Sequence, residues 1–269
     1  MRISEIAVEV DGRRLACSLA APDRAEDLSR EPAVLLSFSA TRQVTLQTQP
    51  YDITARAFVE AGHYALSFDL PNHGERANEY GEGLHGMYAA YAAGDDPFAM
   101  FVADGCAAVD ACLEQGLATA GRVFSCGVSR AGYCALRLAA AEPRISGVTA
   151  LAPVVDWRSL IEFSSIANAS EIEALRLDHW ADRLAGRAIF VAIGNHDHRV
   201  GTDYCARFAQ SLFEAEDCRA PGTSSCQVHI VDSVGHVLPD EWARAGAQFL
   251  LNLCNQSRCH EANQRNEMI

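Results

Sequence analysis

The sequence has no apolar stretch of the roughly 18 residues that a membrane-spanning helix requires. Its N-terminus, Met-Arg-Ile-Ser-Glu-Ile, has no apolar signal core. It also has no run of basic residues, and its formal net charge is −13. Binding to a nucleic-acid backbone needs clustered cationic side chains. We therefore expect neither membrane insertion nor a nucleic-acid partner.

No two of the ten cysteines have the C-x-x-C spacing of a metal site or a redox pair. They are scattered singly, mostly within apolar segments, so we expect most of them to be buried thiols. Together with the lack of a signal core, this favours the reducing cytoplasm. The cysteines are Cys17, Cys106, Cys112, Cys126, Cys134, Cys205, Cys218, Cys226, Cys254 and Cys259.

Two further motifs are incomplete. Gly127 and Gly132 have the spacing of a phosphate-binding loop, but residues 133–134 are Tyr-Cys, where that loop needs lysine and a hydroxyl residue. Residues 196–198, His-Asp-His, are adjacent on one loop, and three neighbouring side chains rarely converge on one ion. We expect no nucleotide, no cofactor and no metal.

The most informative segment is residues 121–132, Gly-Arg-Val-Phe-Ser-Cys-Gly-Val-Ser-Arg-Ala-Gly. A β-type run leads through small residues to an Ala-rich helix, which is the layout of a nucleophile elbow. In the usual G-x-S-x-G pattern a strained turn exposes the serine. Here Ala131 stands at the second glycine position, and Gly132 follows one place late. Ser129 is the candidate nucleophile.

An acid and a base follow the elbow in the chain. Asp197 comes just after the apolar run 188–193, which predicts a buried strand, and His236 follows the predicted strand 227–231. The order Ser, Asp, His is that of the α/β-hydrolases among serine triads. Asp203 and Asp232 are rival acids, but the first begins a predicted helix and the second directly precedes the histidine loop.

These patterns, with a fourth at residues 68–76, make the sequence resemble the α/β-hydrolase superfamily. That fourth segment, Phe-Asp-Leu-Pro-Asn-His-Gly-Glu-Arg, is similar to the D-x-P-G-H-G stretch after the fourth strand of many such hydrolases, with Asn72 in place of the first glycine. The resemblance spans residues 5–252, within the branch of prolyl-oligopeptidase-like and dienelactone-hydrolase-like esterases. It implies one α/β domain over residues 1–254.

Alternating patterns along the chain agree with that architecture. Two strands flank Asp11-Gly12, a hairpin signal, and later strands and helices alternate, which indicates a mostly parallel sheet with helices on both faces. Residues 154–185 predict a small helical cap. We expect a long loop over 79–97 and a frayed polar tail over 255–269. The expected strands are 3–10, 14–19, 33–38, 64–68, 148–152, 188–193 and 227–231, and the later helices are 204–213 and 242–253.

The chemistry assigns a role to each candidate residue. His236 takes the serine proton as general base, and Asp197 fixes the tautomer of the imidazole. The oxyanion is held by the backbone N–H of Arg130 and by that of Ser39 or Ala40, in a loop that lacks the His-Gly of many relatives. The candidate pocket residues are His73, Tyr80, Tyr88, Trp157 and Phe163.

The sequence thus predicts a serine hydrolase that cleaves a small to medium carboxylic ester through an acyl-enzyme. A peptidase or a thioesterase of the same fold is the alternative, although we expect no appended N-terminal domain that would gate peptides. An alternative from another class is a catalytically silent ligand-binding or scaffold protein, motivated by Ala131 and the altered oxyanion loop. The expected partner is a small-molecule ester, and the oligomeric state stays open.

Overall fold

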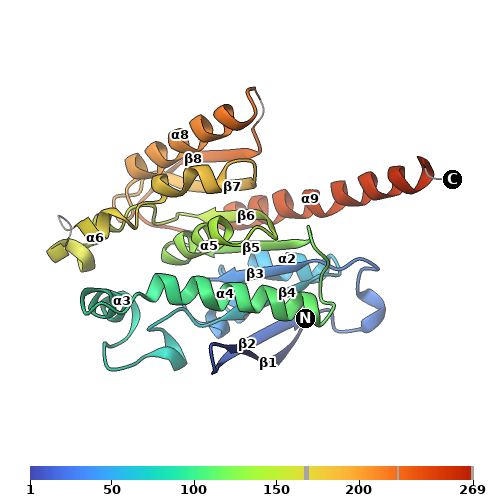
Figure 1. The fold of residues 1–269 in the computed structure, drawn as a ribbon, viewed down its shortest axis with the longest axis horizontal. Helices are drawn as coiled ribbons and strands as arrows, with labels where there is room; N and C mark the ends of the chain where they lie inside the picture. The colour runs from blue at the N-terminus through green and yellow to red at the C-terminus, as the bar shows by residue number, and fades with distance from the viewer. Residues whose placement is uncertain (167–169, 223, 268–269) are drawn as a thin grey trace.

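The computed structural model describes residues 1–166, 170–222 and 224–267, with side chains as far as residue 255. Within these ranges eight strands form one sheet in the order β1-β2-β4-β3-β5-β6-β7-β8 (Figure 1). The strands are β1 (Arg2–Val10), β2 (Arg13–Ala21), β3 (Val34–Phe38), β4 (Tyr64–Phe68), β5 (Val123–Val128), β6 (Ile145–Leu151), β7 (Ala188–His196) and β8 (Cys226–Val234).

The first two strands form the predicted antiparallel hairpin. Asp11 and Gly12 connect them with φ angles of 49° and 77°, as a turn that matches the strand twist requires. β2 pairs antiparallel with β4, and every pairing from β4 through β3 to β8 is parallel. The mostly parallel sheet with an antiparallel N-terminal hairpin is confirmed.

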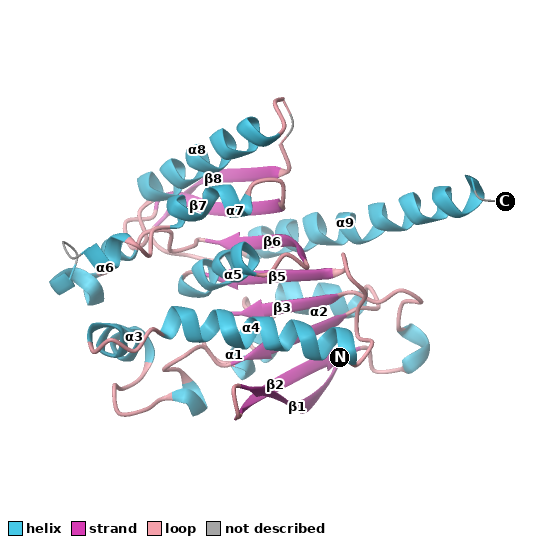
Figure 2. Ribbon diagram, in the orientation of Figure 1, coloured by secondary structure: helices cyan, strands magenta, loops and turns pink. Residues whose placement is uncertain are grey.

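Helices cover both faces of this sheet (Figure 2). On one face Val109 of α4 and Leu138 of α5 are buried in the largest apolar cluster, and on the other Phe58 of α2 and Leu250 of α9 close a second cluster. The helices outside the cap are α1 (Arg42–Gln47), α2 (Ile53–Glu60), α3 (Gly83–Ala92), α4 (Pro97–Glu114), α5 (Arg130–Ala141), α8 (Thr202–Arg219) and α9 (Asp240–Glu267), with 3-10 turns η1 (Ala25–Asp27) and η2 (Gly74–Arg76).

The segment between β6 and β7 folds as the predicted small helical cap, and its described residues contain no strand. Its apolar side chains Ile172, Leu177 and Leu184 are fully buried, which anchors the short helices to the body of the protein. They are η3 (Trp157–Ser159), η4 (Ile161–Ile166), α6 (Ser170–Glu173), η5 (Leu177–Trp180) and α7 (Ala181–Leu184).

Some elements differ from the sequence prediction. The expected loop 79–97 contains helix α3, because Met87 and Ala90 bury an apolar face that the many small residues obscure. β6 begins at Ile145 rather than 148, since Ile145 and Gly147 pair with Val123 and Phe124 of β5. α9 continues past the expected end at residue 253, and its C-terminal part projects from the body in Figure 1.

The parallel strands run with their carboxyl ends toward the left of Figure 1. Loops at this edge carry the residues that the sequence singled out. Ser129 follows β5, Asp197 follows β7, and His236 follows β8 by two residues. In open α/β sheets this edge is where ligands bind.

Candidate active site

Ser129 occupies a strained turn between β5 and α5. Its φ of 57° and ψ of −121° lie outside the regions that ordinary side chains adopt. Its backbone is fixed from both sides, because its N–H donates to Leu151 and its carbonyl oxygen accepts from Val154 at 3.0 Å. A strained residue persists only where its surroundings hold it in place, and such residues cluster at functional sites.

The two glycines of the elbow are required by close backbone approach. A Cβ added at Gly127 would lie 2.0 Å from the carbonyl oxygen of Ala131, and one at Gly132 would lie 2.9 Å from Cβ of Pro153. Ala131 itself is fully buried. The methyl group at the second motif position is therefore accommodated, and the close contact with Pro153 explains the glycine one place later.

A chain of hydrogen bonds joins three residues that lie far apart in the sequence. Nε2 of His236 lies 2.9 Å from Oγ of Ser129, and Nδ1 of His236 lies 2.8 Å from Oδ2 of Asp197. Asp197 is almost fully buried, whereas the His236 side chain is partly exposed. The structure thus brings together the three residues that the motifs selected.

The second carboxylate oxygen of Asp197 accepts from the backbone N–H groups of Arg199, at 3.0 Å, and Val200, at 3.2 Å. Burial opposes ionisation of this carboxyl, but the hydrogen bonds from His236 and the backbone prevail and hold the pKa of Asp197 below its usual value. The rival acids are engaged elsewhere. Asp203 pairs with Arg207 on α8, and Asp232 accepts from Asn195.

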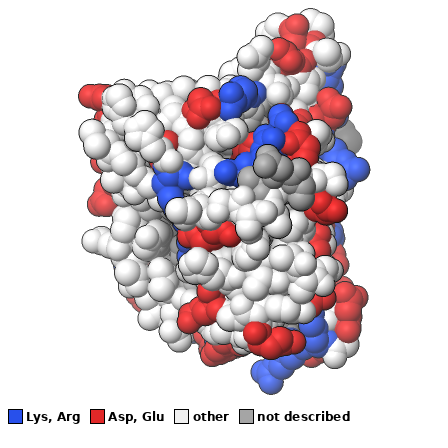
Figure 3. All heavy atoms as spheres, turned by 90° about the vertical axis from the view of Figure 1, so that its left-hand side faces the viewer, with Lys and Arg blue, Asp and Glu red and all other residues white. Residues whose placement is uncertain are grey.

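A cavity of about 250 Å³ opens beside Ser129. Its volume suits a small ligand. Figure 3 shows the face of the molecule on which this edge of the sheet lies. The cavity is lined by Ser39, Ala40, Val44, Tyr51, Leu84, Val128, Ser129, Arg130, Leu160, Arg199, His236, Val237 and Leu238.

Both candidate donors of the loop after β3 line this cavity. Oγ of Ser39 lies 2.8 Å from Oγ1 of Thr45, which turns that hydroxyl toward α1. Within the described residues, the backbone N–H groups of Ala40 and Arg130 donate to no other protein group. They are available to a ligand atom in the cavity.

The structure corrects the predicted pocket set, since none of the five residues lines the cavity. Trp157 and Phe163 are fully buried, with ring centroids 4.9 Å apart, and Trp157 also packs on Phe98 and Tyr133. These large rings stabilise the cap by burial in the core instead of facing a substrate.

The polar members of that set have other partners. Oη of Tyr80 donates to Asp95 at 2.6 Å, and Oη of Tyr88 lies 2.6 Å from Oγ of Ser165. His73 is buried behind the cavity wall, where its Nε2 accepts from Nε of Arg130. The loop that holds His73 is fixed by Asp69, whose carboxylate binds the buried Arg42 and the backbone N–H of Glu75.

Sequence reasoning missed the side chains that do form the wall. Tyr51 precedes α2, Leu160 belongs to the cap, and Arg199 follows Asp197 by two residues. Only Arg199 carried a local signal, because it stands within the acid loop. Its guanidinium pairs with Glu162 of the cap at 2.6 Å, which ties that loop to the cap above the cavity.

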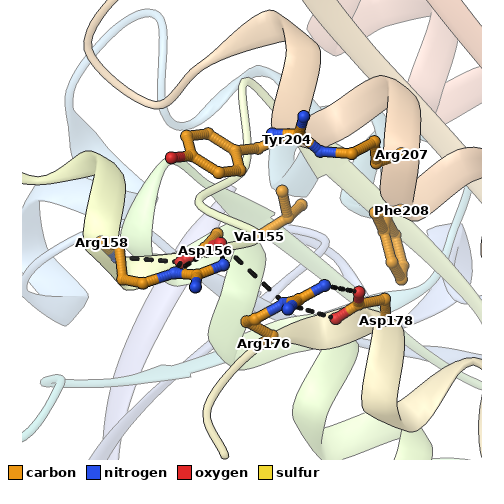
Figure 4. A pocket seen from close by; sticks show the side chains of 8 residues that line it. All are labelled: Val155, Asp156, Arg158, Arg176, Asp178, Tyr204, Arg207 and Phe208. Carbon is orange, nitrogen blue, oxygen red and sulfur yellow. Dashed lines mark hydrogen bonds and ion pairs between the residues drawn. The ribbon is translucent and has the colours of Figure 1, made fainter. Parts of the chain in front are cut away.

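A second cavity, of about 230 Å³, lies between the cap and α8 (Figure 4). Its arginines are neutralised by neighbouring carboxylates. Arg158 binds Asp156 at 2.9 Å, and Arg176 binds Asp178 at 3.1 Å. Arg207 in the same wall pairs with Asp203.

Among the described residues, no three His, Cys, Asp or Glu side chains are grouped as a metal ion would require. In the same part of the chain, no helix combines the length and apolarity needed to cross a membrane.

Comparison with known proteins identifies the fold. No family model matches the sequence, and neither does any curated protein. Solved structures do match. A cold-adapted esterase from an Arctic intertidal metagenomic library has a TM-score of 0.67 and 20% identity, with 92% of each chain covered.

Two further solved structures extend the comparison. An acetyl xylan esterase from Paenibacillus sp. R4 has a TM-score of 0.70 and 16% identity, over 93% of this chain and 83% of the other. Dipeptidyl peptidase 4 from Porphyromonas gingivalis has a TM-score of 0.72 and 18% identity, over 93% of this chain but only 35% of its own. With the sheet order described above, these similarities establish that the chain has the α/β-hydrolase fold.

Proposed function

We propose that the protein is a serine hydrolase that cleaves a small to medium carboxylic ester through an acyl-enzyme intermediate. The observation that carries the proposal is the hydrogen-bonded chain from Ser129 through His236 to Asp197, with the half-buried serine at a strained elbow beside a cavity. The solved esterases of the same fold support the same reaction type.

In the proposed reaction, Oγ of Ser129 attacks the ester carbonyl carbon while Nε2 of His236 takes the hydroxyl proton. The tetrahedral intermediate expels the alcohol, which receives that proton from His236. Water then attacks the carbonyl carbon of the acyl-serine while Nε2 of His236 takes its proton. The second tetrahedral intermediate releases the carboxylic acid, and His236 returns the proton to Oγ of Ser129. Asp197 stabilises the imidazolium that forms in each half of the cycle.

The negative oxygen of the intermediate needs hydrogen-bond donors that are already in place. We assign this role to the backbone N–H groups of Arg130 and Ala40, which have no other acceptor among the described residues. Ser39 is the alternative to Ala40, since its backbone N–H also has no other acceptor among the described residues and it lines the same cavity. The missing His-Gly pattern therefore leaves a donor available in this loop.

The cavity favours a small substrate. Val44, Leu84 and Leu160 give it an apolar wall, and its volume of about 250 Å³ is below that of most drug-sized sites. A peptidase or thioesterase remains the alternative within the same chemistry, supported by the fold shared with dipeptidyl peptidase 4. The unpaired buried thiols of Cys126 and Cys134 suit the reducing cytoplasm, which we propose as the compartment.

The test is exposure of the native protein to a small fluorophosphonate, followed by intact-mass measurement and peptide mapping. We expect a single adduct on the peptide that contains Ser129, and none in Ser129→Ala. Turnover of simple 4-nitrophenyl esters should fall in that variant to a small fraction of the original rate. If the folded protein takes up no reagent and cleaves no ester, the silent binding protein becomes the better explanation.

A further inference from the structure

Within the described residues the side chain of Arg130 forms no ion pair with a carboxylate, although it lines the cavity beside the proposed nucleophile. Its Nε donates to Nε2 of His73 at 2.9 Å, and Nδ1 of His73 in turn lies 2.9 Å from the carbonyl oxygen of Pro71. A carbonyl oxygen only accepts, so Nδ1 carries the proton and Nε2 offers its lone pair to Arg130.

His73 is a neutral partner at physiological pH. Burial and the adjacent charge of Arg130 lower the pKa of His73 to about 4. The imidazole therefore orients the guanidinium without compensating its charge. Burial also lowers the pKa of Arg130, so the protein holds a partly desolvated cation at this position.

Other buried or half-buried arginines of the protein are compensated differently. Arg42 binds the carboxylate of Asp69, and the arginines of the second cavity bind Asp156 and Asp178, as Figure 4 shows. Arg122 pairs with no carboxylate among the described side chains, but its Nη atoms donate to the carbonyl oxygens of Cys254 and Glu31. Arg130 has neither arrangement.

The free donors of Arg130 are its two Nη atoms. Among the described residues they have no hydrogen-bond acceptor, and they are not sealed from solvent, since they are absent from the buried unpartnered atoms of that part of the chain. The described residues that line the cavity include no Asp or Glu. The other arginine there, Arg199, is already paired with Glu162.

The positive side chain of Arg130 stands in the cavity wall of a protein whose formal net charge is −13. Basic side chains reach the middle of the face shown in Figure 3. A planar guanidinium with two free Nη atoms matches a carboxylate through paired hydrogen bonds. One uncompensated positive charge also balances a single negative charge, which favours a carboxylate over a doubly charged phosphate.

We propose that the Nη atoms of Arg130 bind a carboxylate of the substrate, so that the preferred substrates are esters that carry one carboxylate near the scissile bond. The inference rests on the proposed hydrolase function and specifies its substrate class. Arg130 then serves twice. Its backbone N–H holds the oxyanion, and its side chain, positioned by His73, selects the anionic ester.

The test compares matched pairs of acid and amide. The carboxylate stands on the acyl side in mono-4-nitrophenyl glutarate, paired with 4-nitrophenyl glutaramate, and on the alcohol side in 4-acetoxybenzoate, paired with 4-acetoxybenzamide. We expect kcat/KM of the native protein, after subtraction of spontaneous hydrolysis, to favour the acid in one pair by about 10- to 100-fold, as for a hydrogen bond to a charged group. The pair that shows the preference tells which side carries the carboxylate.

Three variants test whether Arg130 is the residue that causes the preference for the acid. In Arg130→Met the ratio of acid to amide should fall to about one, and Arg130→Lys should restore part of it. Arg207→Met removes an arginine of the second cavity and serves as the matched control, with an unchanged ratio. An equal rate for acid and amide in both pairs of the native protein, or a preference that survives in Arg130→Met, overturns the proposal.

Binding without turnover separates this inference from the proposed function. Calorimetry on Ser129→Ala should show tighter binding of monomethyl glutarate than of methyl glutaramate, and the difference should vanish when Arg130→Met is added. If this binding is found but no ester is cleaved, the carboxylate site stands and the hydrolase function fails. Stronger competition by inorganic phosphate than by acetate would instead overturn the choice of carboxylate.

Discussion

Nδ1 of His236 lies 2.8 Å from Oδ2 of Asp197, across 39 residues of sequence. The hydrogen bond joins the loop after β8 to the loop after β7, two neighbouring parallel strands that end at the same edge of the sheet. The pairing of the strands thus places both side chains at the same edge of the sheet. The remaining oxygen of Asp197 is held by backbone N–H groups, so the carboxylate has one orientation.

This relationship predicts the effect of Asp197→Asn. The amide presents the wrong hydrogen-bond pattern to Nδ1 of His236, and loss of the correct tautomer should lower kcat by about 10⁴-fold with the fold retained. Kinetics with a 4-nitrophenyl ester and a circular dichroism spectrum check both statements. The matched control is Asp203→Asn, whose carboxylate pairs with Arg207 on α8 and should leave turnover near that of the native protein. Equal losses in the two variants would contradict the assignment of the acid.

A second prediction concerns the glycine before the elbow. In Gly127→Ala the new Cβ would meet the backbone oxygen of Ala131 at 2.0 Å, and the first turn of α5 cannot move without displacing Ser129. We expect a loss of about 3 kcal/mol or more in the free energy of unfolding, measured by denaturant titration.

The control for this substitution is Gly121→Ala, just before β5. An added Cβ there has open space, so only the positive φ of 84° opposes it, and the expected cost is about 1 kcal/mol. Comparable stability of the two variants would show that the elbow relaxes around the extra methyl group.

A third prediction follows from His73. Its pKa falls from 6.5 to about 4 on folding, so between these values the unfolded chain binds more protons than the folded protein. The contribution of neutral His73 to the free energy of unfolding is fully present above pH 6.5. It is lost as the pH falls toward 4, by roughly 3 kcal/mol in all.

The variant His73→Gln keeps a side-chain acceptor for Arg130 but does not titrate. Denaturant titrations at pH 7 and pH 4.5 should therefore show a smaller loss of stability on acidification in this variant than in the native protein. An identical loss in both proteins would assign the acid sensitivity to other groups.

A fourth prediction concerns the thiols. Burial raises the pKa of Cys126, Cys134 and Cys205 to about 12, which leaves almost no thiolate, whereas Cys218 is exposed. In native protein treated with iodoacetamide, peptide mapping should find Cys218 modified well before the three buried residues. All four should react in denaturant. Labelling of Cys134 as fast as Cys218 would show that the region around α5 opens readily.

The sequence by itself determined the features that depend on local chemistry. The hairpin at Asp11-Gly12, the alternation of strands and helices, and the elbow around Ser129 follow from turn residues and hydrophobic periodicity. Because strands that run parallel end at one edge, the order Ser129, Asp197, His236 after three strands was enough to predict that these side chains meet.

Only the tertiary structure decided what surrounds that site. Trp157 and Phe163 carry the same apolar signal whether they face a ligand or the core, and packing against Phe98 placed them in the core. Helix α3 was hidden because small residues weaken its periodicity. The uncompensated charge of Arg130 is also a tertiary property, since it depends on a neutral His73 from a distant loop and on carboxylates that the fold directs elsewhere. Local sequence sets what each segment can form, but side-chain direction and charge compensation depend on neighbours that only the folded chain brings together.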